Sequence, residues 1–379
     1  MMKMDELRSL FPITREKIYL FNGNIIPCAT PVRRAMETHL EQWTRAGDAC
    51  FRHCMETYQQ AKQLFAELIN ASPESVIGLH STTSGINLAA LMIHPTAGQN
   101  VVVTDLEHIC NVHPWLKFKD EGVEVRYVPA RGGTIEMEDF ARAVDDETAA
   151  VSICHVTMNT GFRWDLAEAC GIAHQHGARI VVDAAQSVGA VPTDVRRWRV
   201  DFLAAPTYKW LLGPMGAAFL YINPELVSAY DPPMAGWLGV QDPFEIDLRD
   251  TRWLRTPQRF EPGGMPGMIC FAGAAAGLGL LGDIGHDTVF KRIEESVTYL
   301  YQGLSDINVT LDTPRRPQQR AGILAMKVRE QDRLWRQLEQ KGIHIGNWAG
   351  YLRIDPGCYN TTEELDAFLA CVGEFTAAS

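Results

Sequence analysis

The feature that most constrains this chain is an alternation of short apolar segments, rich in β-branched residues, with longer segments of helical periodicity. Strands that are apolar throughout must be covered on both faces, and helical connections between parallel strands form right-handed crossovers. The pattern therefore predicts an α/β fold with a mostly parallel sheet. Ligands of such sheets bind beyond the carboxyl ends of the strands. The predicted strands lie at residues 100–105, 123–130, 149–156, 178–185, 201–206 and 217–222.

The pattern changes after about residue 225. Pro, Gly and Trp are concentrated between Asp231 and Gly267, and shorter helical and strand-like patterns follow. They indicate a smaller α+β domain at the C-terminus. A chain of 379 residues suits two domains, and we predict a large domain over residues 15–255 and a small domain over residues 1–14 and 256–379.

Charge and hydropathy exclude several classes of partner. The net charge is −11, from 35 basic and 46 acidic residues, so no diffuse cationic surface attracts nucleic acid or anionic lipid. The longest apolar stretch, Ala272–Gly282, is much shorter than the roughly 20 residues that span a bilayer. The first residues, MMKMDELRSLFPI, carry charges where a signal peptide needs an apolar run. We therefore expect a soluble, cytoplasmic protein without a nucleic-acid or membrane partner.

The nine cysteines are scattered along the chain and form no CxxC pair. This distribution argues against a disulfide framework and against a zinc ribbon. Cys50 and Cys54, with nearby His53, have no second ligand pair to complete a four-ligand site. No metal site is expected.

The most informative segment covers residues 181–222. Asp183 ends one predicted strand, and Lys209 follows the next. An acid that faces a lysine across neighbouring strand ends suits pyridoxal phosphate: the lysine forms the Schiff base, and the carboxylate keeps the pyridine nitrogen protonated, so that the ring accepts electrons. Spacing alone leaves the alternative open that both are solvated loop residues.

Three further segments favour the cofactor. In LHSTTSGINLAAL, Thr82, Thr83 and Ser84 place hydroxyls at a predicted helix N-terminus, where a phosphate is stabilised, although an ordinary helix cap has the same pattern. His108 follows a predicted strand, where its ring could stack on the cofactor or lie in an ordinary loop. Arg353 ends a strand of the small domain, where it could bind a substrate carboxylate or form a surface ion pair.

Together these segments resemble the class V aminotransferase family of fold-type I pyridoxal phosphate enzymes, which includes cysteine desulfurases, cystine lyase and isopenicillin N epimerase. The runs VDAAQSVGAVPTDV and YKWLLGPMGAAFLY carry the resemblance, which extends from YLFNGNIIP to the final helix. It implies a large domain with a mostly parallel seven-stranded sheet, a smaller α+β C-terminal domain, and a homodimer with the cofactor at the subunit interface.

The resemblance also implies roles for individual residues. Lys209 is similar to the Schiff-base lysine, which also moves protons at the substrate's α carbon, and Asp183 to the partner of the pyridine nitrogen. His108 is similar to the stacking ring and Gln186 to the donor to the phenolic oxygen. The implied phosphate ligands are Thr82, Thr83, Ser84, Thr207 and Tyr208, and the implied substrate ligands are Arg353, for the α-carboxylate, and Asn22, in the turn FNGN.

Tyr208 departs from the histidine that many desulfurases have at this position, and two further departures from the family pattern are visible. Gly264 stands where a threonine of the second subunit is expected to hold the phosphate, so that hydroxyl is missing. A desulfurase also needs a nucleophilic cysteine about a dozen residues before the carboxylate-binding arginine, and the stretch KGIHIGNWAGYLR contains none. Cys358 follows Arg353 and is interpreted as a packed residue.

The expected activity is therefore a carbon–sulfur β-lyase that acts on a cysteine S-conjugate. The family's other reactions stay open: transamination, epimerisation and decarboxylation-coupled oxidative deamination. A non-catalytic protein that binds pyridoxal phosphate is a further alternative, but a scaffold has no use for the joint presence of Lys209, Asp183, Gln186, His108 and Arg353.

Overall fold

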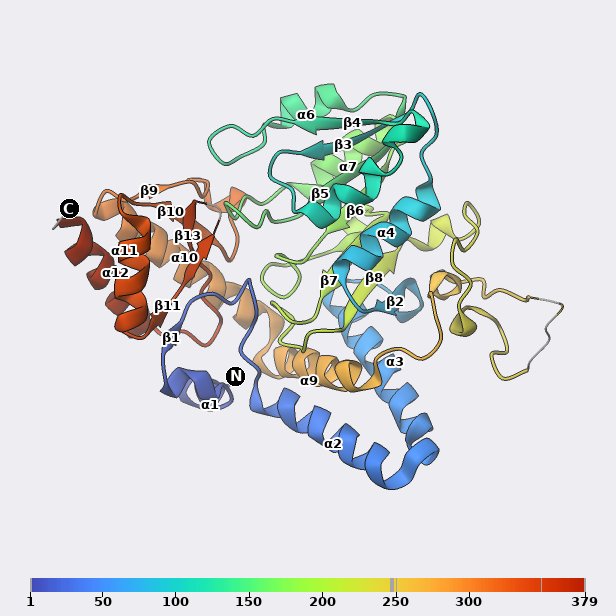
Figure 1. The fold of residues 1–379 in the computed structure, drawn as a ribbon, viewed down its shortest axis with the longest axis horizontal. Coiled ribbons are helices and arrows are strands. Elements are labelled where there is room, and N and C mark those ends of the chain that lie inside the picture. Colours follow the sequence, from blue (N-terminus) through green and yellow to red (C-terminus); the bar gives the residue numbers. More distant parts are fainter. Residues whose placement is uncertain (1, 246–248, 250, 349, 378–379) are drawn as a thin grey trace.

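A computed structural model describes residues 2–245, 249, 251–348 and 350–377 (Figure 1). Its centre is a seven-stranded sheet in the order β2-β8-β7-β6-β5-β3-β4. The strand β8 runs antiparallel to β2 and β7, and the remaining neighbours are parallel. The α/β fold predicted from the apolar runs is confirmed. The strands are β2 (Val76–Leu79), β3 (Asn100–Thr104), β4 (Glu124–Val128), β5 (Thr148–Cys154), β6 (Arg179–Asp183), β7 (Phe202–Pro206) and β8 (Ala218–Ile222).

The central strands are apolar along their length because helices cover both faces of the sheet. In β6, Ile180 and Val182 pack in one core with residues of α3 (Phe51–Leu68) and α7 (Leu166–Gln175). Val181, which points to the opposite face, packs in a second core with residues of α4 (Thr82–Ile93). The alternation of side chains along a strand therefore supplies two cores from one segment.

Below the sheet in Figure 1, α9 (Met268–Ile284) lies against α3 and α2 (Thr30–Ala46). Small residues allow this close approach. An ideal Cβ at Gly273, for example, would lie 3.0 Å from Cγ of Met36 in α2. Within the described part of the chain, no single helix is long and apolar enough to cross a membrane, whereas α9 and α10 (His286–Asp306) pass that test together, as a pair bent by 80°.

A second, smaller sheet has the order β12-β13-β10-β9 and packs with α10, α11 and α12 (Figure 1). The N-terminal segment joins this part of the molecule because β1 pairs in parallel with β11. The domain boundaries predicted from the sequence stay a prediction. The elements are β1 (Ile18–Tyr19), β9 (Thr310–Leu311), β10 (Leu324–Lys327), β11 (Ile343–His344), β12 (Gly346–Trp348), β13 (Tyr351–Ile354), α11 (Gln331–Gln340) and α12 (Thr362–Ala377). The remaining α-helices are α1 (Met4–Ser9), α5 (His113–Leu116), α6 (Met137–Ala143) and α8 (Val195–Trp198).

Candidate active site

An acid and a lysine meet at the carboxyl edge of the central sheet. Asp183 is the buried last residue of β6 and aligns with Ala204 of β7, and Lys209 follows β7 in the next loop. Burial lowers the pKa of Lys209, and the charge of Arg353 lowers it further, while the charge of Asp183 opposes the shift. The neutral, nucleophilic form of this amine is therefore more accessible than in a solvent-exposed lysine.

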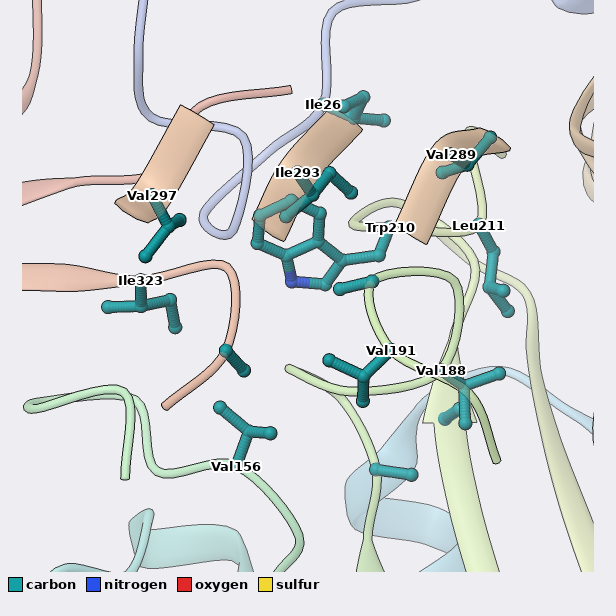
Figure 2. Close-up of a cluster of buried hydrophobic side chains, with 14 of the residues drawn as sticks. Ile26, Val156, Val188, Val191, Trp210, Leu211, Val289, Ile293, Val297 and Ile323 are labelled. Atoms are coloured by element: carbon teal, nitrogen blue, oxygen red, sulfur yellow. The ribbon is translucent and has the colours of Figure 1, made fainter. Parts of the chain in front are cut away.

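The loop that carries Lys209 is fixed by Trp210. Figure 2 shows the indole between Ile26, Val191 and Ile293, which come from three segments far apart in the sequence. Its Nε1 donates to Oε1 of Gln186 at 3.0 Å. Packing against the turn 187–190 requires glycine, because Gly189 has a φ of +92° and an ideal Cβ would lie 2.3 Å from the carbonyl oxygen of Trp210. The backbone of the lysine loop is thus held on several sides.

Asp183 has a hydrogen-bond donor at each carboxylate oxygen. The amide N–H of Ala185 donates to Oδ1 at 2.8 Å, and the thiol of Cys110 donates to Oδ2 at 3.2 Å. Burial and the charge of Asp183 raise the pKa of Cys110, so the sulfur is kept as a thiol donor. Both carboxylate oxygens of Asp183 are therefore hydrogen-bonded and held in place. The sequence analysis missed Cys110, and its only signal was the position two residues after His108.

The predicted stacking histidine lies in the same group of side chains. A ring nitrogen of His108, Sγ of Cys110 and a carboxylate oxygen of Asp183 all lie within 4.8 Å of one another. Nδ1 of His108 accepts the amide N–H of Cys110 at 3.2 Å, which orients the ring. Burial lowers the pKa of His108 and favours the neutral imidazole. A neutral, fixed ring suits stacking on a planar cofactor.

The predicted phosphate turn forms the N-terminus of α4, but its cap is Ser81, which the sequence analysis did not name. The side chain of Ser81 accepts the amide N–H of Ser84 at 3.2 Å. The Ser84 hydroxyl lies 2.8 Å from Nε2 of His80, and Thr83 is exposed. Thr82 is buried, and its hydroxyl has no hydrogen-bond partner among the described residues.

The loop residues Thr207 and Tyr208 lie differently from each other. Thr207 is fully buried, and its hydroxyl donates to the carbonyl oxygens of Pro214 and Ala217. A contact of Thr207 with a phosphate would require that hydroxyl to turn away from both carbonyls. Tyr208 is half-buried, and its ring centroid lies 5.7 Å from Nζ of Lys209. The phosphate roles of both residues stay predictions.

On the substrate side, the turn FNGN connects the two parts of the molecule. Nδ2 of Asn22 donates to the carbonyl oxygen of Asp355 at 2.8 Å, and its Oδ1 accepts from the hydroxyl of Tyr359 at 2.6 Å. Nε2 of Gln186 donates to the carbonyl oxygen of Gly23 at 2.9 Å. The side chains of Asn22 and Gln186 are therefore both engaged within the protein, and their predicted contacts with substrate and cofactor stay predictions.

Arg353 is buried on β13 and is paired with a second acid, Asp355, which the sequence analysis did not single out. Nε of Arg353 donates to Oδ1 of Asp355 at 2.9 Å, and Nη2 lies 2.7 Å from Oδ2. Burial raises the pKa of Asp355, and the charge of Arg353 opposes that shift. The alternation R-I-D, which places both side chains on one face of a strand, was the available signal.

The segment around Gly264 lies beside the start of α4 in the same chain. A cleft of about 490 Å³ is lined by Thr83 and Ser84 on one side and by Gly263, Gly264 and Met265 on the other. The expected contribution of the partner subunit's segment stays a prediction.

These residues fit pyridoxal phosphate. Lys209 supplies an amine for the aldehyde, the carboxylate of Asp183 suits a protonated ring nitrogen, and the ring of His108 suits the pyridine face. The phosphate would lie at the positive end of α4, where the unpartnered hydroxyl of buried Thr82 needs a ligand.

Comparison with known proteins identifies the class. Residues 18–368 match the family Aminotransferase class-V. Over 338 residues the chain is 31% identical to the "Probable cysteine desulfurase" of Methanothermobacter thermautotrophicus, which covers 87% of this chain and 83% of that protein. The protein is thus a pyridoxal phosphate-dependent enzyme. It belongs to the class V aminotransferase family, as the resemblance in the sequence predicted.

Solved structures agree on the fold. The apo cysteine desulfurase of Thermococcus onnurineus NA1 superposes with a TM-score of 0.89 at 24% identity, covering 99% of this chain and 98% of that one. A lysine-to-alanine variant of C-DES with glycine covalently linked to the pyridoxal phosphate cofactor gives a TM-score of 0.89 at 24% identity, covering 97% and 99%. The seven-stranded sheet therefore belongs to a fold that is known to hold this cofactor.

Gly23→Ala tests whether the turn FNGN controls the substrate side of the site. An ideal Cβ at Gly23 would lie 2.4 Å from Nη2 of Arg353, 2.8 Å from Oδ2 of Asp355 and 2.9 Å from Oε1 of Gln186. We expect the variant to fold and bind cofactor, and to need about tenfold or more substrate for half-maximal rate, since small misplacements of binding groups are costly.

The control is Gly171→Ala in α7, where an ideal Cβ meets nothing within 4 Å. Steady-state kinetics of both variants should separate the two positions. An unchanged half-saturation concentration in Gly23→Ala would contradict the placement of the turn beside the substrate.

Proposed function

We propose that this enzyme is a carbon–sulfur β-lyase that cleaves cysteine S-conjugates without an enzyme persulfide. The observation that carries the proposal is the absence of cysteine from residues 341–352, directly before Arg353. Cys358, the next cysteine along the chain, is 3% exposed, and burial raises its pKa to about 12. A thiol of this kind is a poor nucleophile at neutral pH.

A second thiol in the site supports the same proposal. The thiol of Cys110 donates to Asp183, and its raised pKa disfavours the thiolate that would attack sulfur. The sulfur of the substrate is therefore proposed to leave as a thiolate rather than to be transferred to the protein.

The residues of the chain then have defined tasks. When bound, pyridoxal phosphate delocalises the electron pair left at the α carbon after proton removal. Nζ of Lys209, whose pKa is lowered by burial, accepts the α proton. The charge of Asp183 would hold a proton on the ring nitrogen of the cofactor, and the ring of His108 would lie against its pyridine ring. Cleavage of the carbon–sulfur bond and addition of one water convert the conjugate into a free thiol, pyruvate and ammonium.

We also propose a homodimer located in the cytoplasm. Support for the dimer comes from large apolar side chains that are exposed around the site: Ile109 next to His108 is 61% exposed, and Met265 next to Gly264 is 50% exposed. Such side chains beside a functional site are typical of an interface.

The test is an assay of the purified holoenzyme with cystine, S-methylcysteine and S-benzylcysteine. We expect pyruvate and ammonium in equal amounts, together with the matching thiol, or the persulfide of cysteine from cystine. Cys358→Ala should keep the same rate. A keto acid that retains the carbon–sulfur bond, an inverted amino acid, or carbon dioxide as a product would replace the proposal with transamination, epimerisation or decarboxylation. Activity that is lost in Cys358→Ala, with its fold intact, would restore a persulfide route.

A further inference from the structure

The charge of Arg353 is compensated before any substrate arrives. Its Nε donates to Oδ1 of Asp355 at 2.9 Å, which occupies one edge of the guanidinium. Nη2 lies 2.7 Å from Oδ2, close enough for an ion pair but at an angle that forms no hydrogen bond. Nη1, the remaining nitrogen, makes no hydrogen bond or ion pair with any residue in the described part of the chain. One edge of the guanidinium is therefore left for a ligand.

Burial makes this compensation strong. The side chains of Arg353 and Asp355 are 6% and 0% exposed, so water screens their charges little. The turn at Gly23 covers the pair, and Phe21 lies under the guanidinium, with 5.4 Å from Cζ to the ring centroid. With both groups ionised, as in an ion pair, the pair as a whole has a net charge of zero.

Charge compensation changes what the arginine can recognise. A lone buried guanidinium strongly favours a carboxylate over a neutral group, because the carboxylate cancels an otherwise uncompensated charge. Here a carboxylate at Nη1 would also approach the negative charge of Asp355. A neutral carbonyl group, in contrast, accepts the same N–H hydrogen bond without that repulsion. The advantage of an anionic ligand is thereby reduced.

We propose that Asp355 is a specificity-determining residue, which neutralises Arg353 so that the enzyme accepts amino substrates whose carboxyl group is masked as an amide or ester as well as free amino acids. The inference rests on the proposed function insofar as Arg353 faces the substrate's α-substituent. It extends the substrate class from cysteine S-conjugates to their neutral carboxyl derivatives.

The test compares alanine with alaninamide, which differ only in the group that would meet Arg353. Both are primary amines that can exchange with Lys209 at the cofactor and shift its visible band, so titration of the holoenzyme gives their affinities. The affinities are calculated from the concentration of unprotonated amine, because the two amines differ in basicity. We expect the wild type to bind alanine no more than about tenfold more tightly than alaninamide. A preference of a hundredfold or more, typical of an uncompensated arginine, would overturn the proposal without any variant.

Asp355→Asn then removes the charge and keeps the shape and one acceptor oxygen. The ratio of the alanine to the alaninamide affinity should rise by about tenfold or more over the wild type. Comparing two ligands in two proteins isolates the repulsion between the carboxylate of alanine and that of Asp355. Asp312→Asn, which removes the carboxylate that pairs with Lys327 elsewhere in the small sheet, should leave the ratio unchanged. An unchanged or lower ratio in folded, yellow Asp355→Asn would show that Asp355 does not set specificity.

Failure of this inference can be distinguished from failure of the proposed function. The alanine titrations report only amine exchange at the cofactor and do not depend on carbon–sulfur cleavage. If cysteine S-conjugates gave no pyruvate while the ratio rose in Asp355→Asn, the lyase assignment would fail and the role of Asp355 would stand.

Discussion

Lys209→Ala is expected to abolish turnover and to remove the visible absorption band that forms when the lysine is linked to the cofactor aldehyde. Lys209 lies with Asp183 at the carboxyl edge of the sheet and has a pKa lowered by burial. It is assigned both the covalent attachment and the acceptance of the α proton, so one substitution removes two functions. We expect a rate loss of about a thousandfold or more, since a positioned general base alone contributes roughly 10²–10⁴-fold. Absorption spectra and steady-state rates measure the two effects.

The matched control is Lys291→Ala, on the exposed face of α10, where the lysine pairs with Glu295 and its side chain is 74% exposed. It should keep both the band and the rate. A Lys209→Ala protein with full activity would show that another group carries the cofactor chemistry.

The sequence predicted the position of this lysine because of a property of parallel sheets. Asp183 and Lys209 are 26 residues apart (209 minus 183), but each follows an apolar run. Neighbouring parallel strands end at the same edge, so the two residues had to lie close together once the runs were interpreted as β6 and β7. The fold was predictable for the same reason, since a strand that is apolar on both faces implies layers of helices on each side.

The partners of the site residues were not predictable in this way. The thiol of Cys110 reaches Asp183 from a segment 73 residues away, and Gly23 approaches Gln186 from 163 residues away. These pairings depend on where loops lie after the sheet has formed, and no local spacing encodes them.

The direction in which a loop side chain points could not be predicted from the sequence either. Thr207 matches a phosphate ligand in its type and position, but its hydroxyl donates to the carbonyl oxygens of Pro214 and Ala217. A hydroxyl can satisfy its own turn or a ligand, and only the tertiary structure decides between them. Asp355 was missed because the sequence does not show that both it and Arg353 are buried. An acid two residues after an exposed arginine is an ordinary surface residue, whereas a buried one is the ion-pair partner of that arginine.

Asp183→Asn is expected to lower the rate by about a hundredfold or more while the protein stays folded and yellow. The ionised carboxylate holds the proton on the pyridine nitrogen, and a neutral amide cannot, so the ring accepts the electron pair from the α carbon less well. The amide keeps one oxygen for the N–H of Ala185, which donates to Asp183 at 2.8 Å. Turnover and cofactor content, measured on the same preparation, separate chemistry from binding.

Cys110→Ala provides the comparison that isolates the charge. It removes the S–H donor 3.2 Å from Oδ2 of Asp183 but leaves the carboxylate ionised. Because a neutral hydrogen bond of this kind contributes roughly 0.5–1.5 kcal/mol, we expect a change in rate of no more than about tenfold. The two variants should therefore differ in rate by at least an order of magnitude. If Asp183→Asn were as active as Cys110→Ala, the carboxylate charge would have no part in the reaction, and the acid would serve only to hold the turn after β6.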